Sequence, residues 1–184
     1  MDGGKNALAT TGEPMISQKH IEYIVNAHQN HARKQSKAFR KHDGKTPYWI
    51  HPLWCATTIL TETNLDEKTK NEGAIALLYH DVLEDTTQQL PQDLEERIKY
   101  LVREMTFSSS EEEMQQVWQK PKEIRLYKLY DKVNNLLDGS WMPEEKRKKY
   151  QSYAKRLSED VATNYGELNI TKIVNSIRSQ KYQK

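Results

Sequence analysis

The chain has 184 residues and a formal net charge of +2, which leaves room for one domain with a real core and little excess charge for binding nucleic acid. Its single cysteine, Cys55, excludes an internal disulfide and is typical of a reducing compartment. No apolar run is long enough to span a membrane, and the first residues lack the apolar core of a signal peptide. We therefore expect a cytoplasmic protein that needs neither a membrane nor nucleic acid as a partner.

The start of the chain differs from the rest in composition. Residues 1–15 are rich in small and polar side chains and show no periodicity, which predicts a flexible tail. Residues 16–184 are expected to form one domain, and Ser17 is a good N-cap for its first helix. His28 and His31 lie on that helix, but no carboxylate stands beside them at ligand spacing. We interpret them as surface or core-edge histidines and not as a metal site.

The second helix is expected to begin beside His51, because Pro52 stands where prolines open helices. The polar loop before it, residues 41–47, contains the turn residues that end the first helix. At a helix start the backbone is fixed while the imidazole of His51 can point away from the helix, which is a good arrangement for a metal ligand. We expect this helix to reach about Thr63, with Cys55 as a buried structural thiol.

A third, apolar helix is expected from near Asp66, and it brings His80 and Asp81 to the bottom of a cleft. If that helix continues, Glu84 and Asp85 lie one turn below this pair on the same side. The four ionisable groups then repel or desolvate one another unless a cation lies between them. Imidazole and carboxylate together suit Mn²⁺, Fe²⁺ or Zn²⁺. The alternative is a solvated helix end with capping acids.

The remaining helices are expected where a proline or a cap opens an apolar pattern and a glycine or polar link ends it. Ser110 and Glu113 resemble a capping box for the shortest of them. The expected ranges are 91–106, 110–118, 121–138, 143–165 and 170–177. Basic residues gather near Lys146, but acidic neighbours dilute their charge, so we interpret that cluster as a solvated face. No strand-like alternation occurs, and the predicted architecture is all-α.

A polar stripe runs along the helix expected over residues 121–138, opposite its leucines. Its members, spaced three, three and four residues apart, are Arg125, Lys128, Asp131 and Asn135. A solvent-facing stripe explains Arg125 well. It explains Asp131 less well, because apolar neighbours on both sides indicate a largely buried helix. Asp131 is therefore a candidate for a further metal ligand.

Three segments carry a resemblance to a known superfamily: TPYWIHP at 46–52, HDVLEDT at 80–86 and KLYDKVNNL at 128–136. In that order they match the H…HD…D ligand pattern of the HD superfamily of metal-dependent phosphohydrolases. Their flanking residues resemble the hydrolase domain of RelA/SpoT proteins and the small alarmone hydrolases, over roughly residues 20–140. The resemblance implies a single-domain HD-type helical bundle that binds Mn²⁺ or another divalent transition metal. The implied ligands are His51, His80, Asp81 and Asp131.

The resemblance also implies roles for residues outside the ligand set. A second acidic pair after the His-Asp pair marks the branch that cleaves ppGpp, where it holds and deprotonates water. An Arg-Lys pair before the first metal histidine stacks on the base and meets phosphate, although a solvated helix end explains that pair nearly as well. An asparagine four residues after the last metal aspartate touches the ribose or the water network. The residues so assigned are Glu84 and Asp85 for catalysis, and Arg40, Lys41, Asn135 and Lys128 for the substrate.

The implied reaction is hydrolysis of the 3′-pyrophosphate of a guanosine or adenosine alarmone such as ppGpp, the nucleotide of the stringent response. The segment 107–125 departs from the family, because it is shorter, lacks the usual Glu-Arg-Lys stretch and offers only Lys120, Lys122 and Arg125. The departure affects the substrate pocket and leaves the metal ligands intact. A phosphohydrolase for another nucleotide, such as a 5′-nucleotidase, and an inactive regulatory HD domain therefore stay as alternatives. The sequence leaves the preferred metal and a homo-oligomeric state open.

Overall fold

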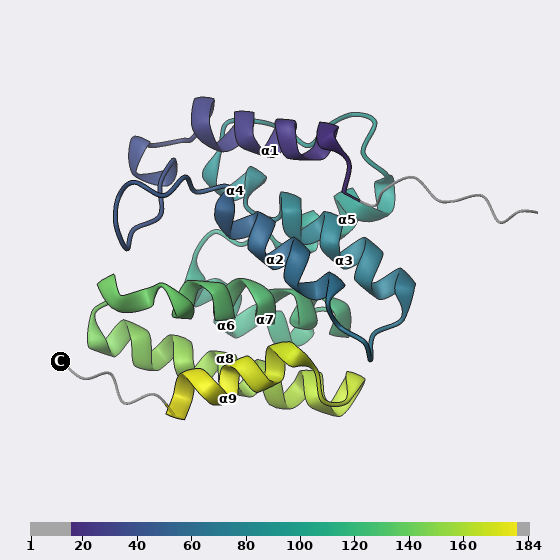
Figure 1. The fold of residues 1–184 in the computed structure, drawn as a ribbon, viewed down its shortest axis with the longest axis vertical. Helices are drawn as coiled ribbons and strands as arrows, with labels where there is room; N and C mark the ends of the chain where they lie inside the picture. The colour runs from purple at the N-terminus through teal and green to yellow at the C-terminus, as the bar shows by residue number, and fades with distance from the viewer. Residues whose placement is uncertain (1–15, 180–184) are drawn as a thin grey trace, which may run out of the picture.

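Helices make up the regular structure of residues 16–179, the part of the chain that the computed structural model describes (Figure 1). The α-helices are α1 (Gln18–Asn30), α2 (Ile50–Leu60), α3 (Glu67–Tyr79), α4 (Val82–Asp85), α5 (Glu96–Met105), α6 (Ser110–Gln116), α7 (Lys122–Leu137), α8 (Glu144–Tyr165) and α9 (Asn169–Ser179). The 3-10 helices are η1 (Gln35–Lys37), η2 (Val117–Gln119) and η3 (Gly139–Trp141). In this part of the chain, strand pairing is limited to two isolated β-bridges. The all-α prediction is confirmed, and the predicted tail, residues 1–15, lies outside the described residues.

Several predicted helix boundaries need correction. The first helix, expected to continue to the loop at residues 41–47, ends at Asn30. The second, expected to reach about Thr63, ends at Leu60. Ser109 accepts a hydrogen bond from the Glu112 amide at 3.1 Å and is the N-cap of α6, one residue earlier than the predicted Ser110. The Glu112 carboxylate accepts from the Ser108 amide at 2.7 Å, so the predicted capping box does not form around Ser110. The helix expected from residue 91 begins only at Glu96. The chain first makes a turn, closed by a hydrogen bond of 3.2 Å from the Leu94 amide to the Pro91 carbonyl. A proline thus precedes this helix without opening it.

The prediction of one unbroken helix through His80 and Asp81 is wrong. α3 ends at Tyr79 and α4 begins at Val82, with the His-Asp pair in the turn between them. The His80 imidazole donates through Nδ1 to the Leu77 carbonyl at 2.6 Å. A continuous helix would offer that carbonyl to the Asp81 amide instead, so the side chain competes with the backbone for one acceptor. The acidic pair therefore belongs to a new helix, in which the Asp85 amide donates to the Asp81 carbonyl at 2.9 Å and lies one turn after it.

The central helices α2, α3 and α7 pack against one another and determine where distant segments meet. α1 covers one end of this centre, and α8 with α9 covers the other (Figure 1). The buried apolar residues form a cluster in which Leu77, Tyr127 and Leu129 are fully buried. The polar ends of α2 and α3 thereby come to lie against the middle of α7. Within residues 16–179, no helix combines the length and the apolarity needed to cross a membrane.

Gly73 on α3 lies where the central helices approach most closely. A Cβ atom there would stand 2.5 Å from Tyr127 Cε1 and 2.7 Å from Ile59 Cδ1, so α7 and α2 leave no room for a methyl group. Gly73→Ala is expected to lower the free energy of unfolding by about 1–3 kcal/mol, because overpacking displaces its neighbours. Gly139→Ala is the matched control, since its Cβ would meet Met142 at ordinary distances of 3.5 Å and more. Urea unfolding measures both variants, and a Gly73→Ala protein as stable as the wild type would contradict the packing described.

Candidate metal centre

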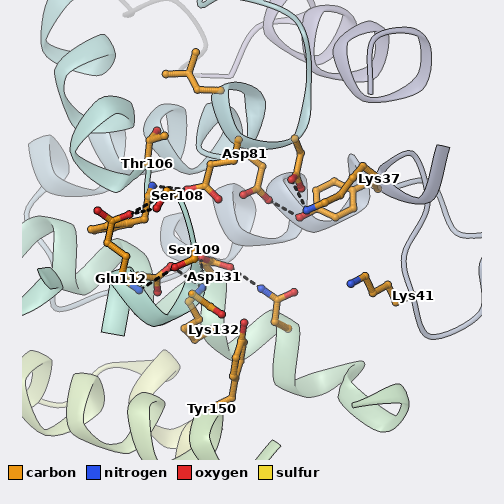
Figure 2. Close-up of a pocket in the computed structure, with 18 of the residues that line it drawn as sticks. Lys37, Lys41, Asp81, Thr106, Ser108, Ser109, Glu112, Asp131, Lys132 and Tyr150 are labelled. Atoms are coloured by element: carbon orange, nitrogen blue, oxygen red, sulfur yellow. Dashed lines mark hydrogen bonds and ion pairs between the residues drawn. The ribbon is translucent and has the colours of Figure 1, made fainter. Parts of the chain in front are cut away.

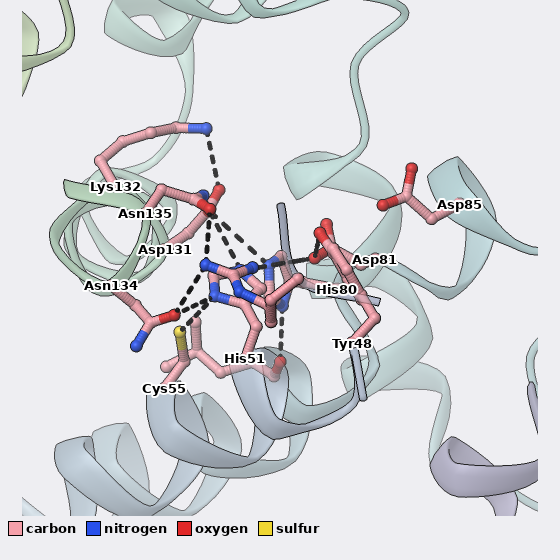
Figure 3. Close-up of polar contacts among 12 residues, drawn as sticks. Tyr48, His51, Cys55, His80, Asp81, Asp85, Asp131, Lys132, Asn134 and Asn135 are labelled. Atoms are coloured by element: carbon pink, nitrogen blue, oxygen red, sulfur yellow. Dashed lines mark hydrogen bonds and ion pairs between the residues drawn. The ribbon is translucent and has the colours of Figure 1, made fainter. Parts of the chain in front are cut away.

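Four polar side chains meet where α2, the turn between α3 and α4, and α7 converge (Figure 3). His51 Nε2 lies 3.4 Å from Asp81 Oδ2 and 3.4 Å from Asp131 Oδ1. His80 Nε2 lies 3.1 Å from Asp81 Oδ2 and 3.9 Å from Asp131 Oδ1. All four side chains are buried. The fold thus brings together the four residues that the sequence predicts as metal ligands.

Hydrogen bonds fix which nitrogen of each histidine faces this centre. His80 donates through Nδ1 to the Leu77 carbonyl, 2.6 Å away. His51 donates through Nδ1 to Asn134 Oδ1, 2.5 Å away. Because each Nδ1 donates to an oxygen, Nε2 is the nitrogen that each ring turns toward the carboxylates of the centre. Neither Nε2 atom has a hydrogen-bond partner among residues 16–179.

Imidazole nitrogens that face carboxylate oxygens at these distances need a positive charge between them, which either a proton on the ring or a bound cation supplies. The pKa shifts in the centre show the same need for a positive charge. Burial lowers the pKa of His80, but the Asp81 carboxylate outweighs it and raises this pKa to about 9. Burial also opposes the ionisation of Asp81, but His80 holds its pKa well below the ordinary value. His51, His80 and Asp131 present atoms close enough to share one ion, and imidazole with carboxylate is a donor set for a divalent cation.

Asp131 is held by a buried network of charges. Lys128 Nζ and Lys132 Nζ lie 3.1 and 3.0 Å from its Oδ2 atom, which leaves Oδ1 for the centre. Both ammonium groups also lie 2.9 Å from Glu113 Oε2, so two positive charges balance two negative ones. Asn135 donates to Asp131 Oδ1 at 2.7 Å and lines the cavity beside it. Lys128 lies beneath Asp131, 1% exposed, and outside the cavity lining, so its geometry differs from the substrate contact expected of it.

A cavity of about 910 Å³ opens beside the centre, with Asp81 and Asp131 in its wall (Figure 2). Its volume is in the range of small-molecule sites. Cations are prominent in the lining, and the lysines among them are Lys34, Lys37, Lys41, Lys120, Lys132 and Lys146. Serine hydroxyls from residues 108–110 complete one side of it. This lining favours an anionic ligand that carries phosphate groups.

The acidic pair on α4, Glu84 and Asp85, also lines the cavity. The Phe107 amide donates to Glu84 Oε1 at 2.9 Å and so orients that carboxyl. Burial raises the pKa of Glu84 to about 7. Burial and the Asp81 carboxylate raise the pKa of Asp85, while its ion pair with Lys37 opposes them. Figure 3 shows Asp85 apart from the four-residue centre. A carboxyl that titrates near neutral pH beside such a centre has the properties of a general base.

The two residues of the predicted Arg-Lys pair, Arg40 and Lys41, lie in different environments. Arg40 is 5% exposed, and its guanidinium donates to Asp138 at 2.8 Å and to Asn135 at 3.2 Å. It thereby fastens the loop before α2 to the C-terminal end of α7, which leaves it little freedom to stack on a base. Lys41 is exposed, and its ammonium points into the cavity (Figure 2). The stacking role of Arg40 and the phosphate role of Lys41 stay predictions.

Sequence reasoning misses several residues of this site. Tyr48 donates its hydroxyl hydrogen to Asp81 Oδ2 at 2.8 Å and orients that carboxylate. Lys37 pairs with Asp85, and Lys146 lines the cavity instead of belonging only to a solvated face. A signal exists for Tyr48, since it stands inside the TPYWIHP segment. The local sequence contains no signal that Lys37 and Lys146 line the cavity, because only the packing of η1 and α8 brings them there.

No family model and no curated protein matches the sequence. Solved structures do match its fold. One of them is a metazoan ortholog of SpoT, a protein that hydrolyses ppGpp and plays a role in starvation responses. The likeness has a TM-score of 0.69 at 23% sequence identity and covers 95% of this chain and 99% of that chain. The chain therefore has the helical fold of that SpoT ortholog over nearly its whole length.

Proposed function

We propose that the protein is a metal-dependent hydrolase that removes the 3′-pyrophosphate of a guanosine or adenosine alarmone such as ppGpp. The products are a nucleoside diphosphate and pyrophosphate. The observation that carries the proposal is the pair of Nε2 atoms on His51 and His80, which have no hydrogen-bond partner among residues 16–179 and face two buried carboxylates beside a lysine-rich cavity. The fold shared with a metazoan SpoT ortholog that hydrolyses ppGpp supports the same substrate class.

The metal would be held by His51, His80, Asp81 and Asp131. When bound there, a divalent cation lowers the pKa of water and neutralises phosphate charge. Two imidazoles with two carboxylates suit a transition metal better than Ca²⁺ or Mg²⁺, and we propose Mn²⁺. Tyr48 would keep Asp81 in its orientation through the hydroxyl bond of 2.8 Å.

Glu84 would accept the proton of the attacking water, because burial holds its pKa at about 7 and the Phe107 amide fixes its direction. Asp85, held by Lys37, would orient the same water. The bond that breaks joins the ribose 3′ oxygen to phosphorus. The water oxygen leaves with the pyrophosphate, and the 3′ oxygen of the ribose takes up a proton. Lys132, which lines the cavity 3.0 Å from Asp131, is placed to offset the charge of the leaving group.

The proposed partner is thus a small nucleotide, bound in the cavity through its phosphates. Ser108 and Ser110 donate their hydroxyl hydrogens to Glu112 and Glu111, which leaves Ser109 as the hydroxyl donor of this wall. The segment lacks the Glu-Arg-Lys stretch of the family, so phosphate binding would rest on a different set of groups here. Lys120 stands in the same wall, where it pairs with Glu104 at 3.0 Å. A cytoplasmic location and a homo-oligomeric state stay predictions from the sequence.

A substrate panel tests this proposal. Protein loaded with Mn²⁺ is incubated with ppGpp, pppGpp, ppApp and nucleoside 5′-monophosphates, and pyrophosphate and orthophosphate are measured separately. We expect an alarmone to be turned over far faster than any monophosphate, with pyrophosphate as the released group. Orthophosphate from the monophosphates, with no pyrophosphate from any alarmone, would instead identify a nucleotidase.

A further inference from the structure

A second cavity, of about 640 Å³, lies between α1, α3 and the segment that leads into α5. Apolar side chains form part of its lining, among them Ile75, Leu94 and Ile98. None of the described residues lines both this cavity and the one beside the metal centre. Its volume is in the range of small-molecule sites, so the fold offers a second place for a ligand.

Tyr79, the last residue of α3, has a hydroxyl group that lacks a hydrogen-bond partner. Its side chain is 2% exposed and lines the second cavity. Within residues 16–179 its ring packs against His20 and Tyr23, but its hydroxyl forms no hydrogen bond. Tyr23 lines the same cavity and, in contrast, donates its hydroxyl hydrogen to the Gln89 carbonyl. Because buried hydroxyls are usually paired, the hydroxyl of Tyr79 is available to a ligand in the cavity.

Two aromatic rings pack against Tyr79 in the wall of this cavity. The ring centroids of His20 and Tyr23 lie 5.7 and 5.6 Å from that of Tyr79. Asn71 lines the cavity as well, and its Oδ1 atom is buried without a hydrogen-bond partner among the described residues. Hydroxyl and amide oxygens accept hydrogen bonds from N–H groups, and aromatic faces attract cations. This wall therefore suits a ligand that carries N–H donors and a positive charge.

The charges around the second cavity are mainly negative. Among the described lining residues Lys19 is the one lysine, and the carboxylates are those of Glu22, Glu72, Asp93 and Glu95. Lys19 pairs with Asp93, and Arg97 pairs with Glu72 at 3.0 Å from outside the lining, whereas Glu22 and Glu95 form no ion pair within residues 16–179. Burial, followed by the charge of Lys19, lowers the pKa of His20, so this ring adds no positive charge at neutral pH. The excess of negative charge favours a cationic ligand.

We propose that the second cavity binds a small organic cation, an amine or an amidine with an apolar body. An N–H group of the ligand donates to the Tyr79 hydroxyl, and its body packs against the rings of His20 and Tyr23. Glu95, which lines the cavity and is exposed, balances its charge. The proposal does not depend on the reaction at the metal centre, because the two cavities share none of the described residues.

Isothermal titration calorimetry of the full chain with benzamidine tests this proposal. Benzamidine carries a cationic amidinium group with several N–H donors on a flat apolar ring, and benzamide has nearly the same shape without the charge. We expect benzamidine to bind at least about tenfold more tightly than benzamide, because hydrogen bonds from a charged donor are stronger than those from a neutral one. Equal affinities for the two compounds, or no binding of benzamidine, would overturn the proposal.

Two variants locate the bound probe in the second cavity. Tyr79→Phe removes only the hydroxyl and should weaken benzamidine binding about tenfold. Glu95→Gln removes a charge at an exposed position and should weaken benzamidine binding about threefold while leaving benzamide unaffected.

Glu111→Gln is the matched control, because Glu111 is exposed on α6, lies outside both cavity linings and changes the net charge equally. It should bind benzamidine as the wild type does, and circular dichroism should show the same helix content in all three variants. Wild-type affinity for benzamidine in both Tyr79→Phe and Glu95→Gln would place the ligand elsewhere and overturn the assignment. Since the measurement is of binding alone, its result stands whether or not an alarmone is hydrolysed.

Discussion

Asp131→Asn is expected to lower the metal content of the purified protein and to reduce turnover by at least about 10²-fold. The change removes a negative charge from the oxygen that faces His51 Nε2 and His80 Nε2, and it leaves the shape of the side chain almost unchanged. Inductively coupled plasma mass spectrometry measures the metal per chain, and released pyrophosphate measures turnover. A normal metal content in this variant would exclude Asp131 as a ligand.

This variant needs a folding control, because two buried lysines pair with Asp131. Asp160→Asn is the matched substitution, since Asp160 on α8 pairs with Arg125 at 2.7 Å and lies outside the cavity lining. It should keep both metal and turnover, and circular dichroism should show the same helix content in the two variants. If Asp131→Asn is folded but has lost its metal, the loss belongs to the ligand and not to the fold.

Glu84→Gln is expected to keep the metal and to lose about 10²- to 10⁴-fold in turnover, because it removes the base without removing a ligand. The glutamine can still accept the Phe107 amide bond of 2.9 Å, so the side chain should hold its position. Glu111→Gln is the matched control, since Glu111 is exposed on α6 and outside the cavity lining. Loss of metal together with activity in Glu84→Gln would show that Glu84 is a ligand or a structural residue.

The pH dependence of turnover follows from the same group. Glu84 must lose its proton to act as a base, so wild-type turnover should rise with pH and level off above about 7. A cation bound nearby favours the ionised carboxylate, so the metal can shift the midpoint of this rise to a pH below about 7 but not above it. Glu84→Gln should lack the rise. An identical pH profile in the variant would assign the titration to another group.

Local signals were sufficient for most helix starts. Ser17, Asp66, Pro121 and Pro143 each stand directly before a helix, as predicted. Of the four, Asp66 caps its helix through a side-chain hydrogen bond, from the Thr69 amide at 2.9 Å. Each of the four signals lies within one turn of the helix that it starts, so the sequence contains the needed information. The break after α3 depends instead on the His80 imidazole bonding the Leu77 carbonyl. Periodicity cannot reveal this break, because the apolar pattern continues across it.

The candidate site likewise has a part that the sequence predicts and a part that it does not. The order of histidines and aspartates along the chain identifies four side chains, and in the fold each of the two histidines lies within 3.9 Å of each of the two aspartates. The residues around these four could not be predicted, because their contacts depend on how distant helices pack. Lys128 and Lys132 stand on one helix, yet only Lys132 lines the cavity. Glu113, which binds both, comes from α6, and the sequence indicates only a helix-capping role for it.

The products formed from ppGpp, with and without metal, test the central claim most directly. The protein is stripped with EDTA, one portion is reloaded with Mn²⁺, and both portions are incubated with ppGpp before anion-exchange chromatography. The account predicts GDP and pyrophosphate in equal amounts from the reloaded protein and no turnover by the stripped one. Release of orthophosphate, or undiminished turnover after the metal has been removed, would contradict it.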